Sequence, residues 1–311
     1  GMITLQNSQY YHYRSPEVMQ QNVFDKSVDI YSFGMIVYSI ISKEIPFRTK
    51  SPFYISHTIL RGIRPEFKDN FPKWYQKLVE HCWSTKPEDR LTADEIVFEL
   101  KTNPEFISEN IDKEKYHNYI KFIEDSLTSK ESNSEEFKMK DYSFLKVRIN
   151  KEKQRKNFSL NIGSINLDNF EKKIKIGAGS FGNVYKVLAK ETGMIDAAKV
   201  SKYDINECDE TTIVNFEREI QIISELNFPS FLKFVGYSPI NFKNQLKPVV
   251  ITELISNGTL GSIIELERMS CANKSWDDTK KLINIYGIAA GVNYLHQLKI
   301  VHRDLKPDNI L

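Results

Sequence analysis

The 311-residue sequence predicts an α+β protein in which a mainly helical segment precedes a segment rich in strands. Three patterns support this prediction. Residues 1–125 carry helix-type apolar stretches, short alternating stretches typical of strands begin at Leu167, and residues 278–297 return to helical spacing. Helices and strands that fall in separate blocks along a chain are typical of the α+β class.

Composition sets only broad limits. With 41% hydrophobic and 27% charged residues, the chain has the profile of a globular protein with a buried core. A net charge of +2 argues neither for nor against a polyanionic partner. Cys82, Cys208 and Cys271 are far apart and match no metal-ligand spacing, so we expect reduced thiols and a cytoplasmic location.

The longest apolar run, residues 28–41, includes Asp29 and two serines. It is too short and too polar to span a bilayer and predicts a buried helix over 29–38. Further on, Thr92 precedes Glu95 by three residues, which is the spacing of a capped helix start. No signal peptide is visible, and Gly1 ahead of Met2 indicates a cloning scar or an internal residue of a longer reading frame.

The middle of the chain, residues 126–164, differs from both flanks. Residues 128–136 are rich in Ser and Glu without large apolar side chains, and residues 146–156 are basic. We interpret this segment as a charged linker between residues 1–125 and residues 165–311. A nucleic-acid or membrane patch is less favoured, because no aromatic interleaving supports it, and we expect neither partner.

The C-terminal segment begins with strands. The sequence predicts strands around 174–176, 183–187, 196–200 and 248–254, and helices over 210–226 and 278–297. A glycine-rich loop falls between the first two strands and comprises Gly177, Ala178, Gly179, Ser180, Phe181 and Gly182. Such a loop lets backbone approach phosphate closely, but alone it is weak evidence of function. A dinucleotide-binding fold needs a helix after the loop, and strand-like sequence follows here.

The end of the chain carries a more specific pattern. His302, Arg303 and Asp304 are followed by Lys306 and Asn309, and this run resembles the catalytic loop of eukaryotic protein kinases. The resemblance implies ATP and Mg²⁺ as cofactors. It implies that Asp304 accepts the substrate proton, that Lys306 neutralises the transferred phosphoryl group and that Asn309 holds the metal. Lysine two residues after the aspartate is the serine/threonine pattern, so we expect protein substrates with Ser or Thr.

The same resemblance extends over the strands. Val184 and Ala197 take the places of residues that contact adenine. Lys199 would hold the α- and β-phosphates, and Glu219 on the predicted helix would fix that lysine. The resemblance implies a five-stranded antiparallel N-lobe that carries this helix.

The resemblance implies a hinge at Thr252, Glu253 and Ile255. Backbone groups of Glu253 and Ile255 would bind adenine, and the Thr252 side chain would limit access to the back of the adenine pocket. The stretch 257–260 after it, with the Cys82-Trp83 pair, is similar to tyrosine-kinase-like serine/threonine kinases.

The helical segment resembles the C-lobe of a kinase. Ser15-Pro16-Glu17 resembles the end of an activation segment, which implies a buried pair between Glu17 and Arg90 and a link from Asp29 to a catalytic loop. The segment also departs from the family, with Gln9 for glycine, Tyr10 for threonine and Leu91 for proline. These departures put the activity of this half in doubt.

The order of the segments is unusual for this family. The C-lobe portion precedes the N-lobe, and the metal-binding Asp-Phe-Gly motif occurs nowhere in the chain. We therefore expect little or no kinase activity from these 311 residues alone. Three interpretations stay open: a piece of a tandem-kinase polypeptide, a permuted pseudokinase that binds nucleotide as a scaffold or allosteric partner, and modules that complement another kinase chain. The oligomeric state cannot be predicted from the sequence.

Overall fold

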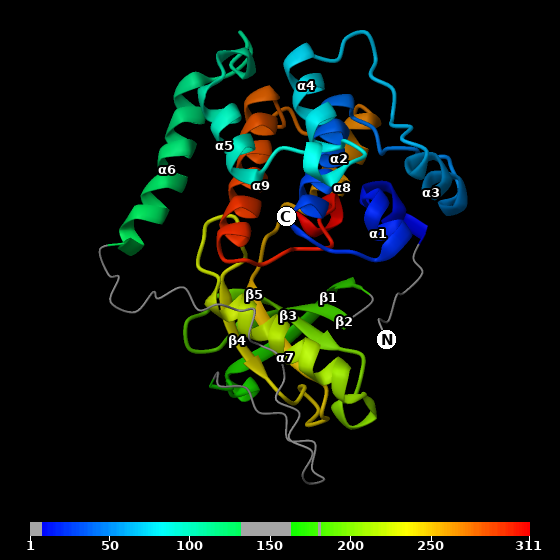
Figure 1. Ribbon diagram of the computed structural model, residues 1–311. Helices are drawn as coiled ribbons and strands as arrows, with labels where there is room; N and C mark the ends of the chain where they lie inside the picture. Colours follow the sequence, from blue (N-terminus) through cyan, green and yellow to red (C-terminus); the bar gives the residue numbers. More distant parts are fainter. Residues whose placement is uncertain (1–7, 132–162, 180–181) are drawn as a thin grey trace. The chain divides into compact units, whose positions relative to one another are not determined.

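The computed structural model describes residues 8–131, 163–179 and 182–311, which form two compact units (Figure 1). The helical unit combines residues 8–131 with residues 257–311. The sheet unit comprises the described part of residues 163–256. The α+β class predicted from the sequence is confirmed.

The helical unit contains eight α-helices and four short 3₁₀ helices among its described residues. Its helices are η1 Ser8–Tyr13, α1 Pro16–Gln21, α2 Lys26–Ser42, α3 Pro52–Leu60, α4 Lys73–Cys82, η2 Pro87–Asp89, α5 Ala93–Thr102, η3 Pro104–Phe106, α6 Lys113–Glu131, α8 Leu260–Arg268, α9 Asp278–Gln297 and η7 Pro307–Asn309. Because α6 runs to Glu131, residues 126–131 are helical although the sequence placed them in the linker.

Helix α2 is buried on all sides, as its apolar run predicted. The Asp25 side chain caps it by accepting the Ser27 N–H at 2.8 Å, and the chain leaves the helix at Lys43 in the left-handed region. Gly34 permits close packing on α4, because a Cβ at this position would lie 2.7 Å from the Cβ of Cys82. Helix α2 therefore provides a fixed base inside the helical unit.

Helix α9 joins the two segments of the helical unit. It packs against α2, α5 and α6 (Figure 1), and its predicted apolar stripe is buried at Leu282, Ile285, Ala289, Val292 and Leu295. Polar contacts also join the two segments of the helical unit. The Asp112 N–H donates to Thr279 Oγ1 at 2.8 Å, and Arg48 forms an ion pair with Glu265 at 2.9 Å. The predicted capping box of Thr92 and Glu95 is present at the start of α5.

The sheet unit has a five-stranded antiparallel sheet in the order β1-β2-β3-β5-β4. Its elements are η5 Leu167–Asn169, β1 Phe170–Ala178, β2 Gly182–Ala189, β3 Ile195–Ser201, η6 Ile205–Glu207, α7 Glu210–Glu225, β4 Phe234–Ser238 and β5 Val249–Glu253. The predicted strands and the helix over 210–226 are confirmed.

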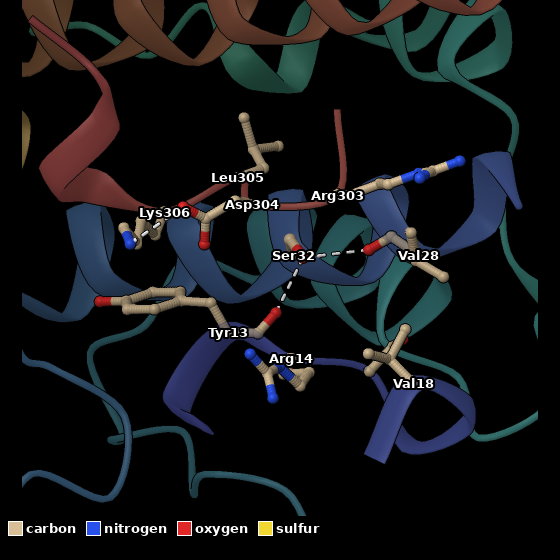
Figure 2. Close-up of a pocket in the computed structure, with 10 residues that line it drawn as sticks. Tyr13, Arg14, Val18, Val28, Ser32, Arg303, Asp304, Leu305 and Lys306 are labelled. Atoms are coloured by element: carbon tan, nitrogen blue, oxygen red, sulfur yellow. Dashed lines mark hydrogen bonds and ion pairs between the residues drawn. The ribbon is translucent and has the colours of Figure 1, made fainter. Parts of the chain in front are cut away.

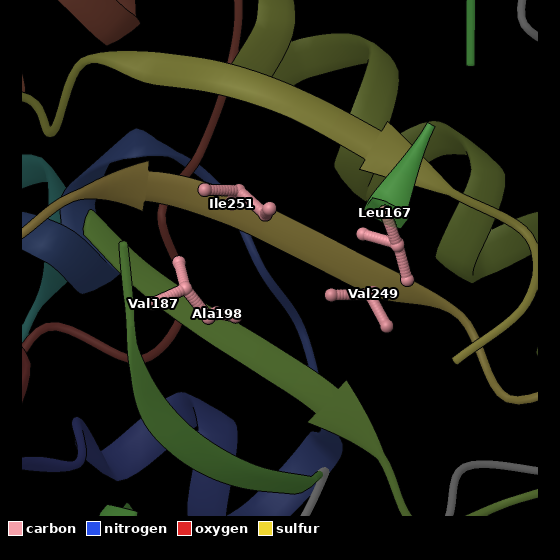
Figure 3. Close-up of a cluster of buried hydrophobic side chains, with 5 residues drawn as sticks. All are labelled: Leu167, Val187, Ala198, Val249 and Ile251. Carbon is pink, nitrogen blue, oxygen red and sulfur yellow. The ribbon is translucent and has the colours of Figure 1, made fainter. Parts of the chain in front are cut away.

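The sheet unit has apolar clusters on both faces of its sheet. One cluster contains Leu167, Val187, Ala198, Val249 and Ile251 (Figure 3). On the other face, Phe216 and Ile220 of α7 pack against Tyr237 and Val250. Helix α7 is thereby fixed against the face that carries Val250. Since residues opposite each other in register point to the same side, Lys199, paired with Val250, also faces this side.

Among the described residues, none of the helices is both long and apolar enough to cross a bilayer.

Candidate catalytic loop and nucleotide-binding residues

The segment from His302 to Asn309 is held at its start by Asp29 of α2. The Asp29 carboxylate is 1% exposed and accepts the backbone N–H of His302 at 2.7 Å and that of Arg303 at 2.9 Å. It also accepts Nε2–H of His296 at 3.0 Å. Arg303 adopts a φ of 68°, a left-handed conformation that is unfavourable for a side chain of this size. The Asp29 contacts fix this turn, and they match the link implied by the sequence.

Three candidate catalytic side chains meet directly after this turn. Lys306 Nζ lies 3.0 Å from Asp304 Oδ2, and Asn309 Nδ2 donates to the same oxygen at 2.9 Å. Asn309 Nδ2 also donates to the Asp304 carbonyl oxygen at 2.7 Å. The Lys306 side chain is 10% exposed, whereas the Asp304 side chain is 57% exposed. The lysine and the asparagine therefore orient a carboxylate that solvent can reach.

A pocket lies beside this carboxylate within the helical unit (Figure 2). Tyr13 and Ser32 line it opposite Asp304 and Lys306. The Ser32 hydroxyl donates to the Tyr13 carbonyl oxygen at 2.8 Å and lies 3.0 Å from the Val28 carbonyl oxygen. Burial raises the pKa of the Tyr13 hydroxyl, which keeps its proton at neutral pH. Of the atypical residues, the side chains of Gln9 and Tyr10 lie outside the described structure.

The predicted pair of Glu17 and Arg90 is present in the helical unit. Arg90 donates from both terminal nitrogens to the two carboxylate oxygens at 2.7 and 2.9 Å, and its side chain is fully buried. Burial acts to raise the pKa of Glu17, but the hydrogen bonds and charge of Arg90 outweigh it and hold the pKa below its usual value. The pair fixes the start of α1 against the loop after α4, where Arg90 also donates to the carbonyl oxygens of Ser84 and Thr85.

The sheet unit carries the second group of predicted residues. Lys199 Nζ on β3 lies 3.7 Å from Glu219 Oε1 on α7, with the side chains 43% and 49% exposed. In register, Val184 on β2 pairs with Lys199, and Ala197 pairs with Thr252 on β5. Because alternate strand residues share a face, Val184, Ala197, Lys199 and Thr252 all face the side where α7 packs.

The glycine-rich segment connects β1 to β2. Gly177 and Ala178 belong to β1 and Gly182 begins β2, while Ser180 and Phe181 lie outside the described residues. A Cβ at Gly182 would lie 2.1 Å from the Val200 carbonyl oxygen, so only glycine allows this approach to β3. Lys202 Nζ donates to the Gly179 carbonyl oxygen at 2.6 Å, a contact that the sequence pattern did not indicate.

The predicted hinge lies at the end of β5. The Glu253 N–H donates to the Lys233 carbonyl oxygen at 3.0 Å, and its side chain accepts the Lys233 N–H at 2.7 Å. Thr252 Oγ1 donates to the Glu253 carbonyl oxygen at 3.2 Å. Ile255 follows in an irregular, half-buried segment. The Glu253 N–H is thus occupied by the Lys233 carbonyl oxygen just before β4, and the Glu253 carbonyl oxygen already accepts one hydrogen bond, from Thr252.

The predicted residues therefore fall into two groups. Asp304, Lys306 and Asn309 meet in the helical unit, whereas Lys199, Glu219 and the described glycine-rich and hinge residues belong to the sheet unit. The sequence analysis did not single out His296, whose only local signal is its position six residues before His302. Within the described ranges, no group of three or more His, Cys, Asp or Glu side chains is arranged to hold a metal ion.

Comparison with known proteins gives a family match in two blocks. The sequence model of the protein kinase domain matches residues 6–100 and 170–311. The chain is 34% identical to Aurora kinase of Saccharomyces cerevisiae over 154 residues, which cover 48% of this chain and 37% of that protein. It is 34% identical to human serine/threonine-protein kinase TNNI3K over 139 residues, covering 44% of this chain and 15% of TNNI3K.

A longer match includes both segments. The chain is 24% identical to dual specificity protein kinase pyk3 of Dictyostelium discoideum over 315 residues, covering 96% of this chain and 20% of pyk3. The chain thus spans between 15% and 37% of the length of these three relatives.

Proposed function

This chain belongs to the protein kinase family, and from that premise we propose that the protein carrying it transfers the γ-phosphate of ATP to Ser or Thr hydroxyls of proteins. The arrangement around Asp304 carries the proposal. Lys306 and Asn309 both contact Oδ2 of Asp304, at 3.0 and 2.9 Å. Among the described residues, Oδ1 has no hydrogen-bond partner and is available to a substrate hydroxyl.

The roles follow from these contacts. Asp304 Oδ1 accepts the proton of the attacking hydroxyl while Oδ2 stays fixed by its two neighbours. Lys306, held at the carboxylate, places a positive charge beside the position where the phosphoryl group accumulates negative charge. The Asp29 contacts keep the backbone of His302 and Arg303 in place, so the carboxylate needs no rearrangement before reaction.

The residues present fit ATP and a divalent metal. Both Asn309 Nδ2 hydrogen bonds go to Asp304, which leaves the Asn309 amide oxygen as a metal ligand. Mg²⁺ prefers oxygen ligands and keeps several waters, so a single amide oxygen suits it. Mg-ATP supplies the phosphoryl group and the metal charge that stabilises its transfer. In the sheet unit, the Lys199 ammonium binds phosphate oxygens, and Glu219 directs it.

Serine/threonine specificity rests on Lys306 two residues after Asp304 and on relatives such as TNNI3K, which is named a serine/threonine-protein kinase. The alternative is dual specificity toward Ser/Thr and Tyr, because pyk3 is named a dual specificity protein kinase. Phosphoamino-acid analysis of autophosphorylated intact protein distinguishes the two. Phosphoserine and phosphothreonine alone support our proposal, whereas phosphotyrosine at a comparable level contradicts the specificity.

We further propose that residues 1–311 alone transfer phosphate poorly, because the sequence lacks Asp-Phe-Gly. The single alignment with pyk3 covers 96% of this chain and 20% of that protein, which supports our interpretation of this chain as a piece of a longer tandem-kinase polypeptide. One observation favours a second candidate, the permuted nucleotide-binding pseudokinase. Residues 8–131 and 257–311 share one compact unit in which Asp29 contacts the catalytic loop.

The test uses the intact protein with radiolabelled ATP, Mg²⁺ and a generic protein substrate. Replacing Asp304 by Asn should lower the rate by about 10²–10⁴-fold, the usual contribution of a general base. Asp69→Asn, an exposed carboxylate of the same unit, should leave it unchanged. If the wild-type protein binds ATP but phosphorylates neither itself nor the substrate, the pseudokinase is correct and our first proposal is wrong.

A further inference from the structure

An arginine without a carboxylate partner follows α3 in the helical unit. Arg64 Nε donates to the Trp83 carbonyl oxygen at 2.9 Å, and Nη1 donates to the carbonyl oxygens of Ile59 and Ile63, each at 3.1 Å. The guanidinium carbon also lies 5.2 Å from the centre of the Tyr31 ring. These contacts fix the group without balancing its charge, because no carboxylate of the described residues forms an ion pair with Arg64.

One N–H bond of this guanidinium has no acceptor in the fold. The Nη2 group carries two N–H bonds, and one of them donates to Thr85 Oγ1 at 3.3 Å. Within the part of the chain that the structure describes, the other N–H of Nη2 has no partner. A fixed, half-buried cation with an unused donor is a favourable position for an anion that has several oxygens.

The neighbouring arginine does not compensate this charge. Both terminal nitrogens of Arg90 donate to Glu17, so the charge of Arg90 is already balanced. Burial lowers the pKa of Arg64, and repulsion by Arg90 acts in the same direction. Two guanidinium groups and one carboxylate therefore leave an excess positive charge, and it belongs to Arg64.

The threonine that contacts Arg64 is open to solvent. Residues 84–86 belong to no helix or strand, and Thr85 is exposed. A Cβ at Gly62 would lie 3.4 Å from Thr85 Oγ1, so the glycine leaves open space on that side of the hydroxyl. An exposed loop hydroxyl is accessible to a modifying enzyme, and a phosphate on Thr85 would stand beside the unused donor of Arg64.

We propose that Thr85 is a phosphorylation site and that its phosphate binds Arg64. Oγ1 of Thr85 forms a bond to the γ-phosphorus of ATP, and the bond from this phosphorus to the bridging oxygen of ADP breaks. The hydroxyl proton passes to the catalytic carboxylate of a serine/threonine kinase that acts in trans. The phosphate brings about −1.5 to −2 charge and three acceptor oxygens to the uncompensated guanidinium.

The phosphate ties the segment after α3 to the loop after α4. Arg90 already holds that loop, because its Nε donates to the Ser84 carbonyl oxygen at 2.9 Å. The added charge-assisted bonds should raise the midpoint of thermal unfolding by about 2–4 °C. This inference goes beyond the proposed function, because the kinase that modifies Thr85 acts in trans and the phosphate does not contact Asp304.

A first experiment asks whether the modification occurs. The intact protein is isolated from growing and from starved cells of its source with phosphatases inhibited, and tandem mass spectrometry locates its phosphates. We expect a fraction of the Thr85 peptide to carry phosphate. A Thr85 peptide without phosphate in both preparations would overturn the proposal.

A second experiment asks whether the phosphate binds Arg64. The intact protein is prepared with phosphothreonine at Thr85 or, as a matched control, at Thr192. Thr192 is exposed, and its hydroxyl contacts no arginine of the described residues. Phosphorus NMR then follows the second ionisation of each phosphate. Because a guanidinium favours the dianion, the pKa of the Thr85 phosphate should lie at least about half a unit below that of the control, which should stay near about 6.

Arg64→Gln identifies the partner of the phosphate. In the protein phosphorylated at Thr85, this variant should raise the phosphate pKa to the control value and remove the thermal gain. If the variant does not fold, the comparison of the Thr85 and Thr192 phosphates in the wild-type background still decides. Equal pKa values for these two phosphates, or a Thr85 phosphate that is insensitive to Arg64→Gln, would show that Arg64 does not bind it. Neither result bears on the proposed phosphoryl transfer by this protein.

Discussion

Replacing Asp29 by Asn should destabilise the helical unit and loosen the candidate catalytic loop. Oδ2 of Asp29 accepts from His302 N and His296 Nε2, and Oδ1 accepts from Arg303 N. An asparagine amide keeps one oxygen and replaces the other by an NH₂ group, which cannot accept. Whichever way the amide turns, at least one of the three donors therefore loses its partner.

The magnitude follows from burial. With the side chain 1% exposed, water cannot replace the lost acceptor. A hydrogen bond to a charged group contributes about 1.5–3 kcal/mol, and an unsatisfied buried donor adds a penalty of about 1–3 kcal/mol. Removing a buried charge offsets part of this loss. We expect the free energy of unfolding to fall by about 2–4 kcal/mol.

Urea unfolding followed by circular dichroism measures this change, and amide hydrogen exchange at His302 and Arg303 reports on the loop itself. Both amides should exchange faster in Asp29→Asn, whereas Asp69→Asn should stay within about 0.5 kcal/mol of wild type. Since Asp29 and His302 are 273 residues apart, the experiment also tests whether the two segments pack together in solution. Unchanged stability and unchanged exchange would refute the contact and the shared unit.

Three further predictions concern other sites. Gly182→Ala should lower stability by about 1–3 kcal/mol in thermal unfolding because its Cβ would collide with β3, whereas Gly179→Ala, with no atom within 4 Å, should not. The lowered pKa of Glu17 stabilises the fold above the ordinary value of 4.5, and this contribution is lost as the pH falls through the folded-state pKa. Glu17→Gln should flatten this acid-side slope in urea unfolding, and an unchanged slope would contradict the assignment. Burial, aided by Glu253, raises the pKa of Asp196, so its ionised form weakens the fold as the pH rises above the ordinary value of 3.8. Asp196→Asn should therefore unfold at higher denaturant than wild type at about pH 7 and at the same denaturant at about pH 3, and equal midpoints at both pH values would argue against it.

Much of the local structure could be predicted from the sequence. The apolar run around Asp29 indicated α2, and the spacing of Thr92 and Glu95 indicated the start of α5, because both signals arise within a few neighbouring residues. The strand β4 was not located from its own residues. It is five residues long with Gly236 at its centre, and its stability comes from pairing with β5.

The candidate site was predictable only in part. The motif around Asp304 indicated that a lysine and an asparagine accompany this aspartate. The structure shows that Lys306 and Asn309 both contact its Oδ2. The contact of His296 with Asp29 spans 267 residues, and no local pattern encodes such a pairing. The bond from Lys202 to Gly179 likewise depends on how β3 passes the glycine-rich segment.

The long separation between Asp29 and His302 also affects how this protein is made. A ribosome adds about 5–20 residues per second, so the 273 residues between them take roughly 15–55 s to synthesise. Until α9 is made, α2, α5 and α6 lack this partner, and the apolar surfaces that α9 covers face solvent or a chaperone. The helical unit is thus the last part of this chain to close, whereas the sheet unit, built from one continuous stretch, can fold while translation continues.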